Sequence, residues 1–311
     1  MSSFRGRILV IRGGAIGDFI LTLPAIAALR RQFPEAFLEV LGYPHIARLA
    51  LAGGLADRVQ SIEARALAEF FARHGDLQEE LVEYFSEFDL IISYLYDPDQ
   101  IFQTNVARCT RAQFIPAPHR PDETSRLHAS RSFLKPLERL AIFDADPVPD
   151  LGLSKQVSRR SQIALHPGSG SEQKNWPEEK WADLTQHLIN LTAHNLLVIG
   201  GEAESDRVQR LGAALSPARV RFAQNLPLPE LASLLNESTL FIGHDSGISH
   251  LAAAVGLPGL LLWGETDQEI WRPPSEKMVI LTDDQGLANL PLSAVLNALK
   301  QFDLSDTPRL A

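Results

Sequence analysis

Short apolar runs alternate with amphipathic stretches along most of the chain. The first run, residues 7–11, is uninterrupted and rich in β-branched residues, which is typical of a strand buried on both faces of a sheet. Comparable runs lie at residues 37–41, 59–62, 90–94, 112–115, 163–165, 196–199, 220–222, 240–242 and 259–263. Because helical spacing of apolar residues separates many of these runs, the pattern predicts an α/β protein with parallel, doubly wound sheets.

The helices are predicted from apolar spacing and from their end signals. They are placed after the first strand and at residues 67–88, 122–142, 177–190, up to about 215, 229–235 and 291–302. The stretch 144–162 is rich in Asp, Pro and polar residues and is interpreted as a linker. The sequence therefore predicts a first domain at 1–155, a second at 156–290, and a C-terminal helix and tail at 291–311.

Size and composition narrow the class of protein. The chain of 311 residues is too long for one ordinary core and suits two domains. Its net charge of −9 argues against a general nucleic-acid binder. A single cysteine, Cys109, excludes an intramolecular disulfide and a Cys-based zinc cluster. The chain contains neither an 18-residue apolar run nor a signal-peptide pattern, so a cytoplasmic enzyme is expected.

The charge is unevenly distributed. Residues 108–139 include seven basic residues and three acidic ones. The basic residues are Arg108, Arg111, Arg120, Arg126, Arg131, Lys135 and Arg139. This basic cluster is interpreted either as a solvated helix face, as a site for an anionic partner, or as a peripheral contact with a membrane surface.

The stretch 240–264 has the order strand, polar turn, helix, strand of a βαβ unit. Asp245 or Ser246 is suited to cap the helix, and the free N–H groups of its first turn would form an anion site. His250 lies four residues beyond Ser246 and returns to the same face, although a structural histidine is the alternative. A hydrolase nucleophile elbow is excluded, because His244 and Ile248 stand where it requires glycines.

Two earlier turns also combine glycines with polar or charged side chains that are candidates for ligand binding. The first, residues 13–18, does not match G-x-G-x-x-G or a P-loop, but it places Asp18 at the start of a helix as a candidate general base or as a simple cap. The second, residues 166–176, combines glycines, two hydroxyls and Lys174, a recurrent combination for holding phosphate. The alternative for the second turn is a surface loop with a solvated lysine.

Three carboxylate pairs could be interpreted as metal ligands. They are Asp97 with Asp99, Asp144 with Asp146, and Asp283 with Asp284. Two carboxylates alone are weak support for a metal, because aspartates serve turns and caps far more often. A metal site is therefore not predicted.

Three motifs together resemble glycosyltransferase family 9, the family of bacterial lipopolysaccharide heptosyltransferases. They are ILVIRGGAIGDFILTLPAIAALRRQFP, HPGSGSEQKNWP and DSGISHLAAAVGLP, at residues 8–34, 166–177 and 245–258. The resemblance implies a GT-B fold, in which two Rossmann-like domains face each other across a cleft and the last helix often returns to the first domain. It also implies inverting, metal-independent sugar transfer without a cofactor, from a nucleotide-diphosphate sugar such as ADP-heptose to an anionic glycolipid or glycan.

The resemblance also implies roles for residues. Asp18 takes the role of catalytic base, with Gly14, Gly17, Arg120 and Arg126 expected on the acceptor side. Ser169, Gly170 and Lys174 are expected at the donor diphosphate, with Glu202 near the nucleoside. Asp245, Ser246, Gly247 and His250 are expected to line the donor sugar and phosphates.

The sequence departs from the family pattern in two turns. It has Pro-Gly-Ser-Gly where heptosyltransferases often carry threonines, and Gly-Glu-Thr-Asp-Gln after Trp263 where Gly-Pro-Thr-Asp-Pro is commoner. These departures leave the donor base and sugar open. A sugar-nucleotide epimerase or hydrolase and a non-catalytic sugar-nucleotide-binding protein are the alternative functions.

Overall fold

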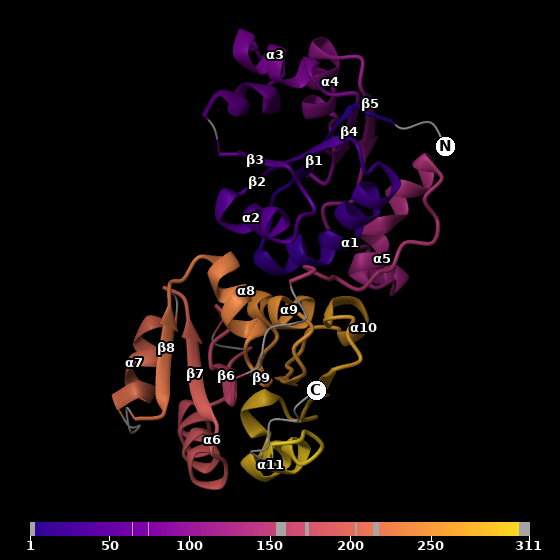
Figure 1. Cartoon of the computed structure of the whole chain (residues 1–311). Coiled ribbons are helices and arrows are strands. Elements are labelled where there is room, and N and C mark those ends of the chain that lie inside the picture. Colours follow the sequence, from indigo (N-terminus) through magenta and orange to yellow (C-terminus); the bar gives the residue numbers. More distant parts are fainter. Residues whose placement is uncertain are drawn as a thin grey trace. The chain divides into compact units, whose positions relative to one another are not determined.

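The computed structural model describes residues 4–63, 65–73, 75–153, 160–171, 174–202, 204–213 and 218–304. The chain divides into two compact units, Met1–Leu151 and Gly152–Ala311, and each contains one parallel sheet (Figure 1). The predicted α/β class is therefore confirmed. The boundary predicted between residues 155 and 156 lies outside the described residues.

The first unit has a five-stranded sheet in the order β3-β2-β1-β4-β5, and its pairings are all parallel. The strands are β1 (Arg7–Arg12), β2 (Phe37–Gly42), β3 (Arg58–Ser61), β4 (Leu90–Ser93) and β5 (Gln113–Pro116). Side chains of the central strand β1 alternate between the faces. Leu9 and Ile11 join a core with Phe70, Phe85 and Phe102 on one face, so this strand is buried on both sides as its sequence predicts.

Helices cover both faces of this sheet. Figure 1 shows α1, α2 and α5 on one side and α3 and α4 on the other. Their bounds are α1 Ile16–Gln32, α2 Pro44–Ala52, α3 Glu79–Ser86, α4 Ile101–Cys109 and α5 Ala129–Leu134.

The helix predicted at 67–88 is wrong, because a 3-10 helix at Arg65–Phe71 and α3 are separate elements. Leu67, Phe70 and Phe85 nevertheless belong to the same core, which explains why their spacing resembled that of one helix. Gly75 lies between the two elements, and a Cβ there would be 2.2 Å from the carbonyl oxygen of Glu69.

The single helix predicted at 122–142 is also wrong. It consists of a 3-10 turn at Glu123–Ser125, then α5, then a 3-10 helix at Lys135–Leu140. Arg126 ends the first piece with a positive φ of 53°, a conformation that a continuing α-helix cannot contain. Pro136 lacks the N–H group that an α-helix needs at that position.

The second unit has a six-stranded parallel sheet in the order β11-β10-β9-β6-β7-β8. The strands are β6 (Gln162–His166), β7 (Asn195–Gly200), β8 (Val220–Gln224), β9 (Leu240–His244), β10 (Gly259–Leu262) and β11 (Met278–Leu281). Since β6 pairs with both β9 and β7, the turns that follow these three strands lie side by side. This adjacency determines the candidate site.

The helices of the second unit are α6 (Glu178–Leu191), α7 (Ser205–Ala213), α8 (Leu228–Asn236), α9 (Gly247–Ala254), α10 (Gln268–Trp271) and α11 (Leu292–Leu299). The main core of this unit combines β-strand side chains with Trp176, Trp181, Val208 and residues of α11. Val295 and Leu299 of α11 are buried in this core. The family resemblance suggested that the last helix could return to the first domain, but the buried face of α11 belongs to the core of the second unit. The tail residues 305–311 lie outside the described residues. No helix of the described ranges is long and apolar enough to cross a membrane.

Candidate functional site

The first unit contains a pocket of 540 Å³ at the carboxyl ends of its strands. This edge is where ligands bind in open α/β sheets. Gly14, Asp18 and Arg120, which were expected on the acceptor side, line this pocket. The remaining lining residues are Arg12, Gly13, Tyr43, Ile62, Glu63, Phe71, Tyr94, Leu95, Tyr96 and His119.

Asp18 lies in the first turn of α1, and its two carboxylate oxygens have different neighbours. Its Oδ2 accepts a hydrogen bond from the backbone N–H of Ala15 at 3.2 Å, which caps the helix. Its Oδ1 lies 3.8 Å from Nη2 of Arg12. Gly14 has a φ of +98°, a backbone conformation that other residues rarely adopt. A Cβ at this position would also lie only 3.1 Å from Oδ2 of Asp18, so a larger residue would crowd this carboxylate. Gly17 belongs to the same helical turn. Asp18 thus caps α1 and also lines the pocket.

Arg12, the last residue of β1, is a buried cation beside this aspartate. Its side chain is 2% exposed, and its guanidinium donates to the carbonyl oxygens of His119 and Asp18, at 2.8 and 3.3 Å. The guanidinium also lies over the Phe133 ring, 4.6 Å from the centroid. Burial lowers the pKa of Arg12, and the nearby Asp18 carboxylate opposes this shift. The buried cation therefore has the Asp18 backbone and carboxylate as neighbours.

The pocket also carries aromatic rings. Tyr96 is 68% exposed, and its ring lies 4.7 Å from the ring of His119. Tyr43 and Phe71 line the same pocket. Burial first, and then the charges of Arg12 and Arg120, lower the pKa of His119, so its ring is neutral at neutral pH. Exposed aromatic faces combined with carboxylates and arginines can contact a sugar through both its apolar face and its hydroxyls.

The basic residues of the cluster at 108–139 have different surroundings in the structure. Arg108 donates to the carbonyl oxygen of Gly75 at 3.0 Å, and Arg120 forms an ion pair with Glu123 at 3.5 Å. Arg126 is exposed and is not among the residues that line the pocket. Arg131, Lys135 and Arg139 are exposed as well. Of the two arginines predicted on the acceptor side, the structure brings only Arg120 to the pocket.

In the second unit, the turns after β6 and β9 place opposite charges together. Nζ of Lys174 donates to Oδ2 of Asp245 at 2.6 Å. The lysine side chain is 38% exposed, whereas that of Asp245 is 9% exposed. The structure therefore brings together two residues that the sequence predicted at the donor, 71 positions apart.

The helix α9 begins beside this pair. Ser246 is its N-cap, since its hydroxyl accepts from the N–H of Ser249 at 3.4 Å. Of the two capping residues predicted, the structure selects Ser246. Gly247 is the first residue of α9, and His250 is buried in its second turn. The first turn of α9 thus presents N–H groups next to Lys174 and Asp245, and such a turn favours an anion.

A carboxylate that the sequence did not predict, Glu204, joins the turns after β6 and β7. Its Oε1 accepts from the N–H of Gly170 and its Oε2 from the N–H of Gly201, each at 2.9 Å. A Cβ at Gly168 would be 2.0 Å from Cγ of Glu204, so a larger residue there would displace this side chain. Glu202, which was predicted near the nucleoside, is exposed.

The hydroxyl of Ser169 lies 2.8 Å from Oδ1 of Asn175 and 2.9 Å from the carbonyl oxygen of Ser171. The hydroxyl therefore bonds within its own turn. A hollow of 220 Å³ lies beside this turn and is lined by Gly170, Ser171, Asn175, Glu204, Asp206, Arg207 and Arg210.

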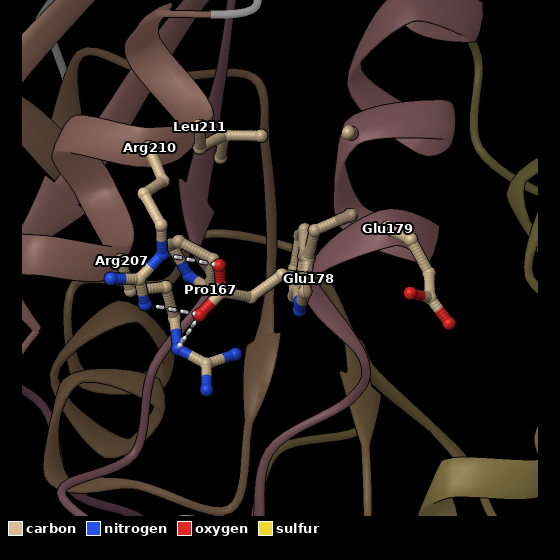
Figure 2. A pocket seen from close by; sticks show the side chains of 8 residues that line it. Pro167, Glu178, Glu179, Arg207, Arg210 and Leu211 are labelled. Carbon is tan, nitrogen blue, oxygen red and sulfur yellow. Dashed lines mark hydrogen bonds and ion pairs between the residues drawn. The ribbon is translucent and has the colours of Figure 1, made fainter.

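The start of α7, next to Glu204, is tied to the start of α6. Figure 2 shows Glu178 of α6 between Arg207 and Arg210 of α7. Arg210 donates to both oxygens of Glu178, from Nε at 2.8 Å and from Nη2 at 2.6 Å. These bonds lower the pKa of Glu178. This bidentate pair joins α6 to α7, and Glu204 immediately precedes α7.

Two buried histidines lie at the ends of β6 and β9. Nδ1 of His166 is 3.3 Å from the hydroxyl of Ser246. Burial lowers the pKa of His166 to about 4 and that of His244 to about 3. Both rings are therefore neutral at neutral pH, and Lys174 supplies the positive charge beside Asp245.

The carboxylate pairs considered as metal ligands have structural partners. Asp97 accepts from the N–H groups of Phe102 and Gln103 at 3.1 and 2.9 Å, and Asp99 lies 3.5 Å from Arg73. Asp146 and Asp283 each accept from the backbone N–H two residues later. The capping and turn interpretation is therefore confirmed for Asp97, Asp146 and Asp283. Among the described residues, no group of three or more His, Cys, Asp or Glu side chains is placed to hold a metal ion.

Several of the residues that the sequence reasoning missed share one signal, although Glu204, four residues after β7, does not. Arg12 and His244 are the last residues of β1 and β9, and Tyr43 and Tyr94 directly follow β2 and β4. Polar and aromatic residues at the carboxyl ends of parallel strands lie where these folds bind ligands. Attention to every strand end, in addition to the glycine turns, would have identified them.

Comparison with known proteins decides the family. Residues 125–291 match the sequence profile described as glycosyltransferase family 9 (heptosyltransferase), which is more than half of the chain. The protein belongs to glycosyltransferase family 9. It is therefore a glycosyltransferase, as the sequence motifs predicted.

Relatives and solved structures agree with this assignment. The chain is 22% identical over 300 residues to lipopolysaccharide heptosyltransferase 3 of Escherichia coli, covering 85% of each protein. It is 26% identical over 295 residues to lipopolysaccharide heptosyltransferase 1 of Pseudomonas aeruginosa, covering 84% of this chain and 79% of that protein. Its fold is similar to the structure of E. coli ADP-heptose lps heptosyltransferase II, with a TM-score of 0.76, 18% identity, and 95% and 98% of the two chains covered. This likeness confirms the predicted GT-B fold for the family 9 enzyme.

Proposed function

We propose that this family 9 glycosyltransferase transfers a sugar from a nucleotide-diphosphate donor to a hydroxyl of a glycan acceptor with inversion. ADP-heptose is the first candidate donor and a lipopolysaccharide-core glycan the first candidate acceptor, because relatives are lipopolysaccharide heptosyltransferases and the similar solved structure is that of E. coli ADP-heptose lps heptosyltransferase II. A nucleotide-sugar donor implies a cytoplasmic reaction. The observation that carries the proposal is the meeting of Lys174, Asp245 and the first turn of α9 at one edge of the second sheet.

The donor fits this edge for chemical reasons. The diphosphate accepts hydrogen bonds from the ammonium of Lys174 and from N–H groups of the first turn of α9, and both kinds of donor are common in phosphate sites of proteins. Asp245, already at hydrogen-bond distance from Lys174, then accepts from hydroxyls of the sugar. The carboxylate of Glu204 accepts from the ribose hydroxyls, and it takes the nucleoside role that the sequence assigned to Glu202.

The acceptor binds at the pocket of the first unit, and Asp18 acts as general base. Oδ1 of Asp18 removes the proton of the acceptor hydroxyl, the oxygen attacks the anomeric carbon, and the bond between that carbon and the phosphate oxygen breaks. The departing nucleoside diphosphate gains negative charge, which Lys174 and α9 stabilise. Neither a cofactor nor a metal ion takes part in this mechanism. Arg120, together with the exposed cations Arg131, Lys135 and Arg139, supplies positive charge for an anionic acceptor or for a membrane surface that carries it.

Two measurements test the proposal. Thermal unfolding with a panel of nucleoside diphosphates and nucleotide-sugars should show stabilisation by one nucleoside diphosphate and by its sugar. Release of nucleoside diphosphate from that sugar should then require a glycan acceptor. Release without an acceptor would indicate the hydrolase or epimerase alternative, and binding without any release would indicate the non-catalytic alternative.

A further inference from the structure

His244 contacts both ends of the turn that carries Lys174 and the beginning of α6. Its ring is fully buried at the end of β9. Nε2 accepts from the backbone N–H of Trp176 at 2.9 Å and from Nε1–H of Trp181 at 3.3 Å. Nδ1 lies 3.3 Å from the carbonyl oxygen of Gly168. Because a carbonyl oxygen can only accept and both tryptophan groups donate, the ring is the neutral tautomer with its proton on Nδ1.

These contacts act on the turn that carries Lys174. Gly168 lies near the beginning of the turn and Trp176 at its end, so one ring contacts both ends. The backbone N–H of Trp176 donates to His244 at 2.9 Å. The ammonium of Lys174 donates to Asp245, the residue after His244, at 2.6 Å. Two residues of one segment, separated by Asn175, are thus bonded to two adjacent residues of the other.

We propose that His244 is a positioning residue for Lys174, and that it thereby determines how well the site binds the diphosphate of the donor. The role rests on the proposed donor site. The ring fixes where the backbone of residues 174–176 lies, and this sets the point from which the lysine stem starts. An imidazole suits the task because one rigid ring provides a donor and an acceptor on different sides. Protonation would remove the acceptor at Nε2, and burial prevents it by lowering the pKa of His244 to about 3.

Two substitutions separate the contacts. His244→Gln retains an oxygen near the position of Nε2, so it can still accept from Trp176. His244→Asn is polar as well, but its amide reaches only to the position of Nδ1 and loses the bond to Trp176. The affinities of ADP, or of the nucleoside diphosphate that the panel identifies, and of the matching nucleoside are measured by calorimetry, with thermal unfolding as the check of folding.

We expect His244→Asn to weaken diphosphate binding about tenfold, the effect of one well-placed hydrogen bond, while nucleoside binding changes less than about threefold. His244→Gln should restore most of the affinity. In a Lys174→Met background His244→Asn should have almost no further effect, because the two residues act through one contact. Equal losses for diphosphate and nucleoside, or full additivity with Lys174→Met, would overturn the positioning role.

Wild-type protein labelled with 15N-histidine provides a measure that does not depend on the folding of His244→Asn. The ring nitrogens of His244 should shift when the diphosphate is added and stay unchanged with the nucleoside. Unchanged shifts with the diphosphate would overturn the role although the proposed function stands. If the wild-type protein binds no nucleoside diphosphate at all, the proposed function fails and this role fails with it.

Discussion

Nζ of Lys174 lies 2.6 Å from Oδ2 of Asp245, so the cation expected at the diphosphate is held by a carboxylate of the neighbouring turn. The lysine side chain remains 38% exposed, which leaves it accessible to a ligand. The ion pair orients the ammonium toward the start of α9 before a donor binds. A pre-oriented cation loses less side-chain entropy on binding.

Lys174→Met should weaken binding of the nucleoside diphosphate by about 10- to 100-fold, the range for a charge-assisted hydrogen bond. Binding of the nucleoside alone should be nearly unchanged. Calorimetric titration of both ligands checks this. Lys300→Met, which removes an exposed lysine that follows α11, serves as the control and should bind both ligands like the wild type. Equal losses for nucleoside and diphosphate would contradict the phosphate role.

Asp18→Asn should reduce turnover by roughly 10²- to 10⁴-fold, the usual contribution of a general base. Donor affinity should stay within about threefold of the wild type, because the amide can still accept from the N–H of Ala15 and cap α1. Steady-state rates with saturating acceptor and separate donor titrations provide the measurement. Asp99→Asn removes an exposed carboxylate elsewhere in the unit and should leave turnover unchanged. A parallel collapse of donor binding in Asp18→Asn would remove the base assignment.

Glu204→Gln and Glu202→Gln distinguish the carboxylate found in the structure from the one predicted by the sequence. If Glu204 accepts from the ribose, the wild type should prefer ADP over 2′,3′-dideoxy-ADP by about tenfold or more. Glu204→Gln should lose most of this preference, whereas Glu202→Gln should keep it. A preference that survives in Glu204→Gln and disappears in Glu202→Gln would restore the original assignment.

Stability should decrease in mild acid because of the buried histidines. The pKa values of His166 and His244 are lowered to about 4 and about 3, whereas a histidine of the unfolded chain titrates near 6.5. Between these values the unfolded state binds more protons than the native state, so the free energy of unfolding rises with pH. The stabilisation is therefore complete above pH 6.5 and is lost as the pH falls toward 4 and 3.

Thermal unfolding of the wild type and of His244→Gln across this pH range measures the effect. The melting temperature of the wild type should fall more steeply with decreasing pH, because His244→Gln removes one of the two titrating groups. His45→Gln, at an exposed position of α2, should follow the wild-type curve. Identical slopes for the wild type and His244→Gln would show that His244 does not contribute to the acid sensitivity.

Turnover should survive treatment with EDTA, because the proposed mechanism assigns stabilisation of the leaving group to Lys174 and α9. The assay compares rates before and after chelation, with and without added Mg²⁺. Loss of activity that Mg²⁺ restores would contradict the metal-independent mechanism.

Strands β1 to β10 were predicted from the sequence to within a few residues, whereas β11 (Met278–Leu281) and several helices were not. A strand buried on both faces is a continuous apolar run, as at β1 and β4, and few other structures produce that pattern. The segment 67–88 shows that helical spacing of apolar residues can occur without one continuous helix. Its aromatic residues have helical spacing because they fill one core, although the chain turns between them. Spacing reports which residues are buried together and only indirectly the path of the backbone.

The glycine turns, Asp18, Lys174 and Asp245 could be identified as candidates from residue type and from their position after strands. Local chemistry was sufficient for this, because a flexible turn at a helix start favours anions wherever it occurs. The distinction between Glu202 and Glu204 was beyond local reasoning. Two carboxylates near one helix start look alike in sequence, and only the hydrogen bonds to Gly170 and Gly201 separate them.

The sequence by itself determined the parallel α/β class, the family and most of the residue types in the candidate site, since these depend on local periodicity and on contiguous motifs. Only the tertiary structure decided which of those residues meet. The order β9-β6-β7 brings together turns that are up to about 80 residues apart in the chain, and the ring of His244, at the end of β9, accepts from Trp176 in the turn after β6 and from Trp181 of α6. Such contacts depend on which strands are neighbours, and strand order is set by packing of the whole sheet and its helices rather than by any single segment.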